Sequence, residues 1–70
     1  MVDNLIKLVN IIYQTPLLNA NELAKAIDVS IPTINRYLRI LRTLIISELQ
    51  GARKTGGYRI TENFRKYLDQ

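Results

Sequence analysis

The feature that most constrains the fold is a short break, Asp28-Val29-Ser30, which separates two segments with helical spacing of apolar residues. Ser30 suits the N-cap of a helix, and Pro32 lies close to the first helical position, where its missing N–H costs nothing. Two amphipathic helices, over about 19–28 and 31–43, are therefore expected to meet at an angle across this turn. The inward positions are Leu23, Ala24 and Ile27 in the first helix and Ile34, Leu38, Leu41 and Ile45 in the second.

Further elements flank this pair of helices on both sides. An apolar stripe with helical spacing precedes Thr15-Pro16, and a residue before proline is pushed out of the helical region. A glycine-rich stretch between two strand-like segments predicts a hairpin, and Thr61 followed by Glu62 is typical of a helix start. The expected order is α-α-α-β-β-α in one domain over residues 1–70, mostly helical with a small β-hairpin. The expected bounds are 3–14, 19–28, 31–43 and 62–68 for the helices, 44–50 and 58–61 for the strands, and 51–57 for their basic connection.

The composition excludes several classes of site. The 70 residues include neither cysteine nor histidine, so disulfides, thiolate metal sites and the commonest general base are excluded. The acidic residues fall mostly at helix starts, turns or ends, where capping and the helix dipole explain them. We therefore expect no enzymatic activity, cofactor, metal or small-molecule ligand. The longest apolar run, Leu44–Ile46, is too short to span a membrane, and Met1–Asp3 does not open a secretory leader, so we expect a cytoplasmic protein.

Basic residues are concentrated in one half of the chain. The net charge is +4, from ten Lys or Arg and six Asp or Glu, and the sequence pI is about 9.8. Six of the ten basic residues lie within 31–60, where Glu48 is the one acidic residue. Most of the six are arginine, whose planar guanidinium matches phosphates and guanine edges. These observations favour a polyanionic partner over the alternative of a solvated basic surface without a ligand.

The segment 21–41, NELAKAIDVSIPTINRYLRIL, resembles the helix-turn-helix unit of DNA-binding proteins. Its continuation, LRTLIISELQGARKTGGYRIT, is similar to the hairpin of winged-helix proteins, in which a glycine-rich basic loop forms the wing. The resemblance implies a winged helix-turn-helix domain with a three-helix core plus wing, as in DeoR- and MarR-like transcription regulators of prokaryotes or phages. One departure is Asp28, which occupies a turn position usually held by glycine and would adopt the same turn at a cost of about 1 kcal/mol.

The resemblance also implies which residues would meet DNA. The helix over 31–43 would lie in the major groove, and the wing over 51–57 would contact the backbone or the minor groove, in sequence-specific binding of double-stranded DNA for transcription regulation. Residues early in this recognition helix would reach base edges, where asparagine bonds adenine and arginine forks onto guanine. The expected base contacts are Thr33, Asn35 and Arg36. The expected backbone contacts are Ser30, Arg39, Arg42, Arg53, Lys54 and Thr55.

Apolar residues on the first and last predicted helices favour a protein contact as well. We expect Ile6, Tyr13, Phe64 and Tyr67 to pack in the core or to join a homodimer that reads a two-fold site. Two alternatives stay open, namely a winged-helix module that binds protein and the DNA-binding portion of a larger regulator. Met1 leading directly into a capped helix favours a complete small protein.

Overall fold

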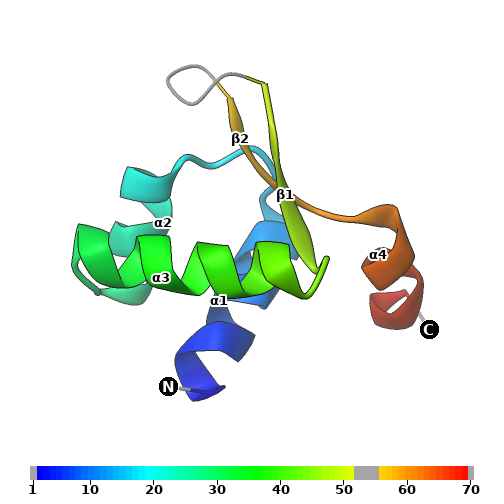
Figure 1. The fold of residues 1–70 in the computed structure, drawn as a ribbon, viewed down its shortest axis with the longest axis horizontal. Helices are drawn as coiled ribbons and strands as arrows, with labels where there is room; N and C mark the ends of the chain where they lie inside the picture. Colours follow the sequence, from blue (N-terminus) through cyan, green and yellow to red (C-terminus); the bar gives the residue numbers. More distant parts are fainter. Residues whose placement is uncertain (1, 52–55, 70) are drawn as a thin grey trace.

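Helices dominate the structure, and a hairpin separates the third helix from the last. The computed structural model describes residues 2–51 and 56–69. Figure 1 shows α3 (Ile31–Thr43) crossing the front of the molecule, with α1 (Val2–Gln14) behind it, the hairpin rising above and α4 (Glu62–Leu68) to one side. The predicted fold class and element order are confirmed. In chain order the elements are α1 (Val2–Gln14), α2 (Ala20–Ile27), α3 (Ile31–Thr43), β1 (Ser47–Gln50), β2 (Gly57–Ile60) and α4 (Glu62–Leu68).

Three helices begin at residues whose side chains cap them, and two of these residues, Ser30 and Thr61, are the helix starts that the sequence predicts. The Asn19 side chain accepts a hydrogen bond from the Glu22 N–H (2.8 Å), and the Glu22 carboxylate accepts one from the Asn19 N–H (3.1 Å), which together form a capping box. Ser30 caps α3 and Thr61 caps α4, each by accepting a hydrogen bond from a backbone N–H. Asp28 ends α2 with φ +57°, so the turn between α2 and α3 has the predicted left-handed residue.

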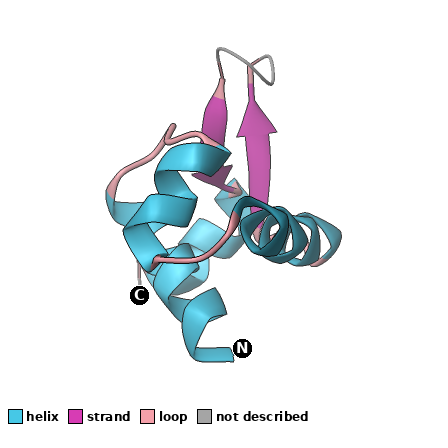
Figure 2. Ribbon diagram, turned by 90° about the vertical axis from the view of Figure 1, so that its left-hand side faces the viewer, coloured by secondary structure: helices cyan, strands magenta, loops and turns pink. Residues whose placement is uncertain are grey.

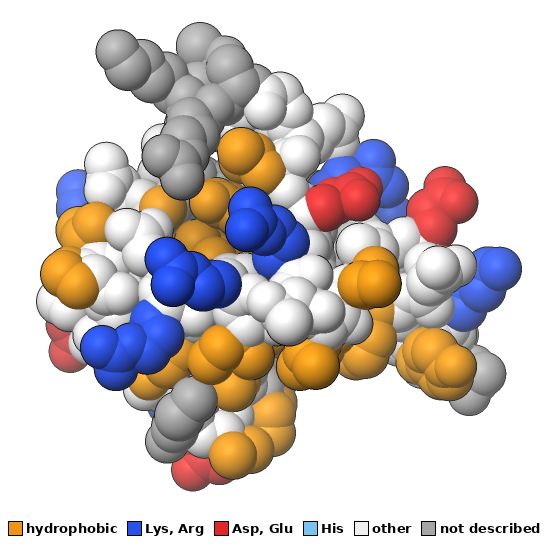
Figure 3. Space-filling model, viewed as in Figure 1, with side chains coloured by type: hydrophobic (Ala, Val, Ile, Leu, Met, Phe, Trp, Pro, Cys, Tyr) orange, Lys and Arg blue, Asp and Glu red, His pale blue; other side chains and the backbone are white. Residues whose placement is uncertain are grey.

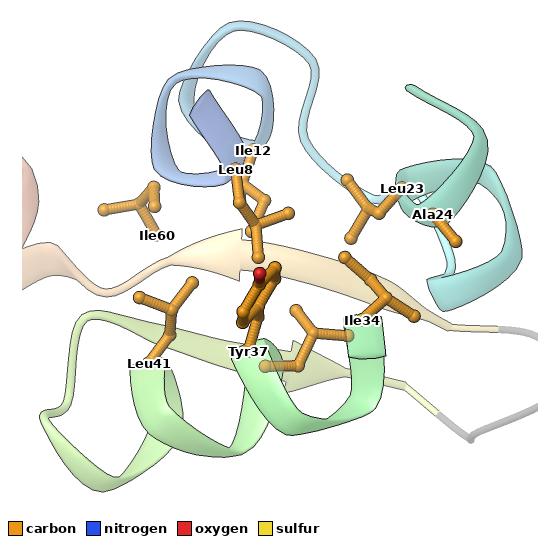
Figure 4. Close-up of a cluster of buried hydrophobic side chains, with 9 residues drawn as sticks. Leu8, Ile12, Leu23, Ala24, Ile34, Tyr37, Leu41 and Ile60 are labelled. Atoms are coloured by element: carbon orange, nitrogen blue, oxygen red, sulfur yellow. The ribbon is translucent and has the colours of Figure 1, made fainter. Parts of the chain in front are cut away.

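An apolar core lies where α1, α2, α3 and β2 meet. Figure 4 shows buried side chains from these four elements pointing toward one another. Tyr37 is among them, and Asn4 Nδ2 of α1 donates a long hydrogen bond to its hydroxyl (3.4 Å), so Tyr37 packs against α1. Tyr58 of the hairpin packs against the edge of the core. The buried apolar residues are Leu8, Ile12, Leu23, Ala24, Ile34, Tyr37, Leu38, Leu41 and Ile60.

The hairpin is anchored to the segment that precedes α2. On the edge of β2 away from β1, the Tyr58 N–H donates to Leu18 O (3.0 Å), and the Leu17 N–H donates to Tyr58 O (2.9 Å). Gly57 is required beside this bridge, because a Cβ there would lie 2.1 Å from Leu17 O. Figure 2 shows the two strands rising side by side from the helices. β2 begins and ends one residue earlier than predicted, and it ends at Ile60 because Thr61 caps α4 instead of extending the strand.

The predicted first strand begins too early. The sequence predicts a strand over 44–50, but β1 begins at Ser47. The preceding residues close α3 instead, since Ile45 takes φ +58° and the N–H groups of Ile45 and Ile46 donate to carbonyls in the last turn of α3 (3.0 and 2.8 Å). The Thr61 hydroxyl donates to Ile45 O (2.7 Å) and holds this turn from a distant part of the chain. Ile45 is 63% exposed, so its predicted place in the buried stripe of α3 is wrong.

Candidate nucleic-acid interface

α3 presents a polar, cationic face to solvent. A helix has about 3.6 residues per turn, so Ile34, Leu38 and Leu41 turn inward and are buried, while residues between them turn outward. Figure 3 shows Lys and Arg side chains gathered over α3. Because α3 contains no acidic residue, all the charge on this outward face is positive. Its exposed polar residues are Asn35, Arg36, Arg39, Arg42 and Thr43.

A groove of about 480 Å³ runs between α3, the start of α2 and the hairpin. On the α3 side, the polar residues Asn35, Arg39 and Arg42 and the apolar residues Ile31 and Leu38 line it. On the hairpin side, Leu49 and Tyr58 line it. The positive charges of the groove therefore lie on its α3 wall, beside apolar side chains, whereas its hairpin wall is largely apolar.

The two faces of the hairpin differ in charge. Side chains alternate between the faces of a strand, and Leu49 and Tyr58, which pair across the hairpin, both line the groove. Arg59 lines a separate hollow of about 240 Å³. Its guanidinium donates to Gln50 Oε1 (3.1 Å) and lies 3.8 Å from Glu48 Oε1. Among the residues that the structure describes, the groove thus takes its positive charge from α3.

The arginines of α3 form no ion pair with the other described residues. The ion pairs within 2–51 and 56–69 join Arg59 to Glu48 and Arg65 to Asp69, each at an N···O distance of 3.8 Å. A guanidinium without an acidic partner keeps its fork of N–H donors available to an anion. The outward face of α3 therefore suits a polyanion such as the backbone of a nucleic acid.

Two of the predicted contacts belong to the cap of α3. Ser30 Oγ donates to Thr33 Oγ1 (2.9 Å) and accepts from the Thr33 N–H (3.4 Å). Ser30 is exposed, whereas Thr33 is half-buried. The Ser30 hydroxyl is therefore engaged as donor and as acceptor in holding the start of the helix, and the Thr33 hydroxyl takes part as an acceptor. Arg53, Lys54 and Thr55 lie outside the described residues, so the contacts expected of them stay predictions.

Only some of the predicted residues of α3 line the groove, and one residue that the sequence did not predict lines it as well. Asn35, Arg39 and Arg42 border the groove, whereas Arg36 is exposed without lining it. Asn21, an exposed residue at the start of α2, lines the groove as well, and sequence reasoning did not select it. The available signal was its position, because the first helix of a helix-turn-helix unit crosses the DNA backbone when the second enters the major groove.

The four residues expected in the core or at a dimer contact lie in different surroundings. Ile6 is 54% exposed and Tyr67 is 70% exposed, while Phe64 is half-buried against the core. Tyr13 also packs against the core, and its hydroxyl donates to the Asp69 carboxylate. This hydrogen bond raises the pKa of Tyr13 above its ordinary value, and partial burial and the negative charge of Asp69 add to the effect. Ile6 and Tyr67 are thus the exposed members of the set.

The acidic residues do not build a metal site in the part of the chain that the structure describes. No group of three or more His, Cys, Asp or Glu residues there could hold a metal ion. Among the helices described, none has the length and apolar character needed to cross a membrane.

Comparisons with known proteins agree with this geometry. A family model described as winged helix-turn-helix DNA-binding matches residues 1–44. The chain is similar in structure to the multiple antibiotic-resistance repressor MarR from Listeria monocytogenes, with TM-score 0.82 and 14% identity over 94% of this chain and 46% of that one. It is also similar to FabT from Streptococcus pneumoniae in complex with DNA, with TM-score 0.82 and 15% identity over 97% of this chain and 49% of that one.

A further crystal structure of MarR has TM-score 0.82 and 23% identity, over 96% of this chain and 51% of that one. These likenesses extend to the hairpin and α4, which the family match does not include. The chain spans about half the length of each of these structures. Among curated protein sequences, no relative matches the chain.

Proposed function

The chain belongs to the winged helix-turn-helix DNA-binding family, and from that premise we propose that it binds double-stranded DNA sequence-specifically as a transcription regulator. The observation that carries the proposal is the outward face of α3, whose arginines form no ion pair with other described residues. Such side chains supply the salt-dependent part of DNA affinity by neutralising phosphates. We propose binding without catalysis, because the chain lacks the histidine and cysteine from which nucleophile–base pairs are most often built.

In this proposal α3 lies in the major groove of the duplex. That groove is about 12 Å wide and admits an α-helix. The hairpin would then lie beside the neighbouring backbone strand or reach the minor groove beyond it. Arg39 and Arg42 would meet phosphates at the edge of the major groove, with Arg53, Lys54 and Thr55 as further backbone contacts. The base contacts would come from the remaining exposed residues of α3.

Fluorescence anisotropy with duplexes selected from a random library tests this function. Binding should weaken as salt rises. Arg42→Gln should weaken it further and make the logarithmic salt dependence shallower by about 0.9, because one fewer phosphate is neutralised. Lys66→Gln is the matched control, because it removes one exposed charge from α4, outside the groove. Absence of duplex binding by the unaltered chain at low salt, or the same salt dependence in both variants, would contradict the proposal.

We also propose that two copies associate through α1 and α4. Ile6 and Tyr67 support this, because they are large, exposed apolar side chains on these helices. A two-fold dimer would place two recognition helices on related half-sites. In sedimentation equilibrium at micromolar concentration, Tyr67→Lys should shift the chain toward monomer, whereas Asn63→Lys, at an exposed polar position of α4, should not. A monomer of 8.1 kDa for the unaltered chain would count against association.

Residues 1–70 are proposed to act as one domain of this family. The shared core of α1, α2, α3 and β2 supports this, and Phe64 and Leu68 pack α4 against it. Thermal unfolding should then show one cooperative transition, and two separate transitions would argue against a single unit. A regulator that acts on the DNA of a prokaryotic cell works in the cytoplasm, which is the compartment we propose.

A further inference from the structure

The exposed polar residues of α3 lie in two environments. Asn35, Arg39 and Arg42 border the groove between α3 and the hairpin, whereas Arg36 is exposed outside it. Successive residues of a helix are about 100° apart around its axis, so Asn35 and Arg36 point in different directions although they are neighbours in the sequence. The two side chains would therefore meet different parts of a bound duplex.

The geometry of B-DNA indicates which part of the duplex enters the groove. The major and minor grooves are adjacent, and one sugar–phosphate strand separates them. With α3 in the major groove and the hairpin beside that strand or beyond it, the strand must pass between α3 and the hairpin. The groove occupies this space.

The two walls of the groove match such a strand. The α3 wall carries the guanidiniums of Arg39 and Arg42, and a DNA strand presents one phosphate about every 3.4 Å along the helix axis. The opposite wall, formed by Leu49 and Tyr58, is mainly apolar and suits the carbon-rich edge of the sugars. Asn35 lies on the same wall as the two arginines, where its amide can donate to a phosphate oxygen.

We infer that Arg36 is the residue of α3 that determines sequence specificity, and that Asn35 is a positioning residue that holds the sugar–phosphate strand together with Arg39 and Arg42. The inference rests on the proposed function and replaces the sequence-based assignment of Asn35 to a base. Arginine reads guanine by donating two parallel hydrogen bonds to O6 and N7. Arg36 can offer both donors, since it is exposed and forms no ion pair with the other described residues. A hydrogen bond from Asn35 to the DNA backbone does not directly distinguish one base sequence from another.

The test compares binding preferences and not affinity alone. A preferred duplex is first selected from a random library with the unaltered chain, and its variants with one base pair changed are then measured by fluorescence anisotropy. Arg36→Lys keeps the positive charge but removes the two parallel N–H donors of the guanidinium. The preference for one base pair over the alternatives at that position should therefore fall by about 5- to 150-fold, while the salt dependence stays the same. Asn35→Ala should weaken every duplex by the same factor and leave their order unchanged. Thermal unfolding of both variants checks that the exposed substitutions leave the fold intact.

The outcomes separate this inference from the proposed function. An unaltered chain that binds no duplex overturns the proposed function itself. If the chain binds but Arg36→Lys keeps every base preference, Arg36 does not read a base and the inference is wrong. A changed base preference in Asn35→Ala overturns the assignment of Asn35 to the backbone strand.

Discussion

Ile45 closes α3 in a backbone conformation that suits glycine better than other residues. Its φ is +58°, a region that costs an L-residue about 1–2 kcal/mol and that a β-branched side chain tolerates poorly. Because the side chain is mostly exposed, it recovers little of this cost through burial. Replacing Ile45 with glycine should therefore relieve strain without leaving a cavity.

Leu44 allows the magnitude of this strain to be isolated. Leu44 directly precedes Ile45, and its side chain is 62% exposed, compared with 63% for Ile45. Its φ is −83°, outside the left-handed region. Leu44→Gly and Ile45→Gly each remove an exposed apolar side chain, and each adds about 0.5–1 kcal/mol of backbone entropy to the unfolded state. These contributions are similar in the two variants, so the difference in stability between the variants measures the strain at Ile45. Ile45→Gly should be about 1–2 kcal/mol more stable than Leu44→Gly, which separates the unfolding midpoints by about 4–16 °C in a domain of this size.

Circular dichroism during thermal and urea unfolding measures both variants. Ile45→Gly should unfold at or above the midpoint of the unaltered chain, and Leu44→Gly should unfold below it. Ile45→Asn should also unfold above Leu44→Gly, because asparagine is enriched in left-handed conformations. Equal midpoints for the two glycine variants, with equal dependence on urea, would refute the strain at Ile45.

Three further predictions concern the core, the hairpin and α4. Leu8→Ala removes a fully buried side chain and should lower the free energy of unfolding by about 2–5 kcal/mol; urea unfolding measures this, and a decrease below about 1 kcal/mol would contradict the packing of the core. Gly57→Ala places a Cβ 2.1 Å from Leu17 O, so the bridge between Tyr58 and Leu18 should open and the midpoint of urea unfolding should fall. A midpoint like that of the unaltered chain would be inconsistent with this close approach. Asp69→Asn should lower the pKa of Tyr13 toward its ordinary value, because the residue that accepts the Tyr13 hydrogen bond is no longer charged. Phenolate absorbance measured against pH gives this pKa, and Tyr13→Phe identifies the part of the absorbance that comes from Tyr13. Since the folded-state pKa of Tyr13 is raised, the stability from its hydrogen bond to Asp69 is present below its unfolded pKa of about 10 and disappears as the pH rises through the folded pKa.

The boundaries between the first three helices were predictable because their signals act over a few residues. Asn19 and Ser30 each accept a hydrogen bond from a backbone N–H three positions on, so the residue type at one position decides where a helix begins. Asp28 likewise takes the left-handed conformation that the turn requires, although glycine would adopt it at lower cost. These interactions do not depend on the rest of the chain.

The start of β1 could not be predicted in the same way. The residues of 44–46 favour a strand by local preference, yet the Thr61 hydroxyl and N–H donate to the carbonyls of Ile45 and Ile46 (2.7 and 3.0 Å). Thr61 directly follows β2, whereas Ile45 and Ile46 directly precede β1. These hydrogen bonds therefore form only when the two strands of the hairpin have come together. Strand preference depends strongly on such context, and here the non-local hydrogen bonds outweigh it.

The sequence by itself determined that α3 has a buried apolar side and an exposed cationic side, because the helical period acts on residues of one element. It could not separate Asn35 from Arg36, since both lie on the exposed side. That difference depends on where the hairpin stands, and the hairpin is held by the bridge between Tyr58 and Leu18. Only the tertiary structure therefore decided which exposed residues line the groove, because a groove is made of surfaces that distant parts of the chain bring together.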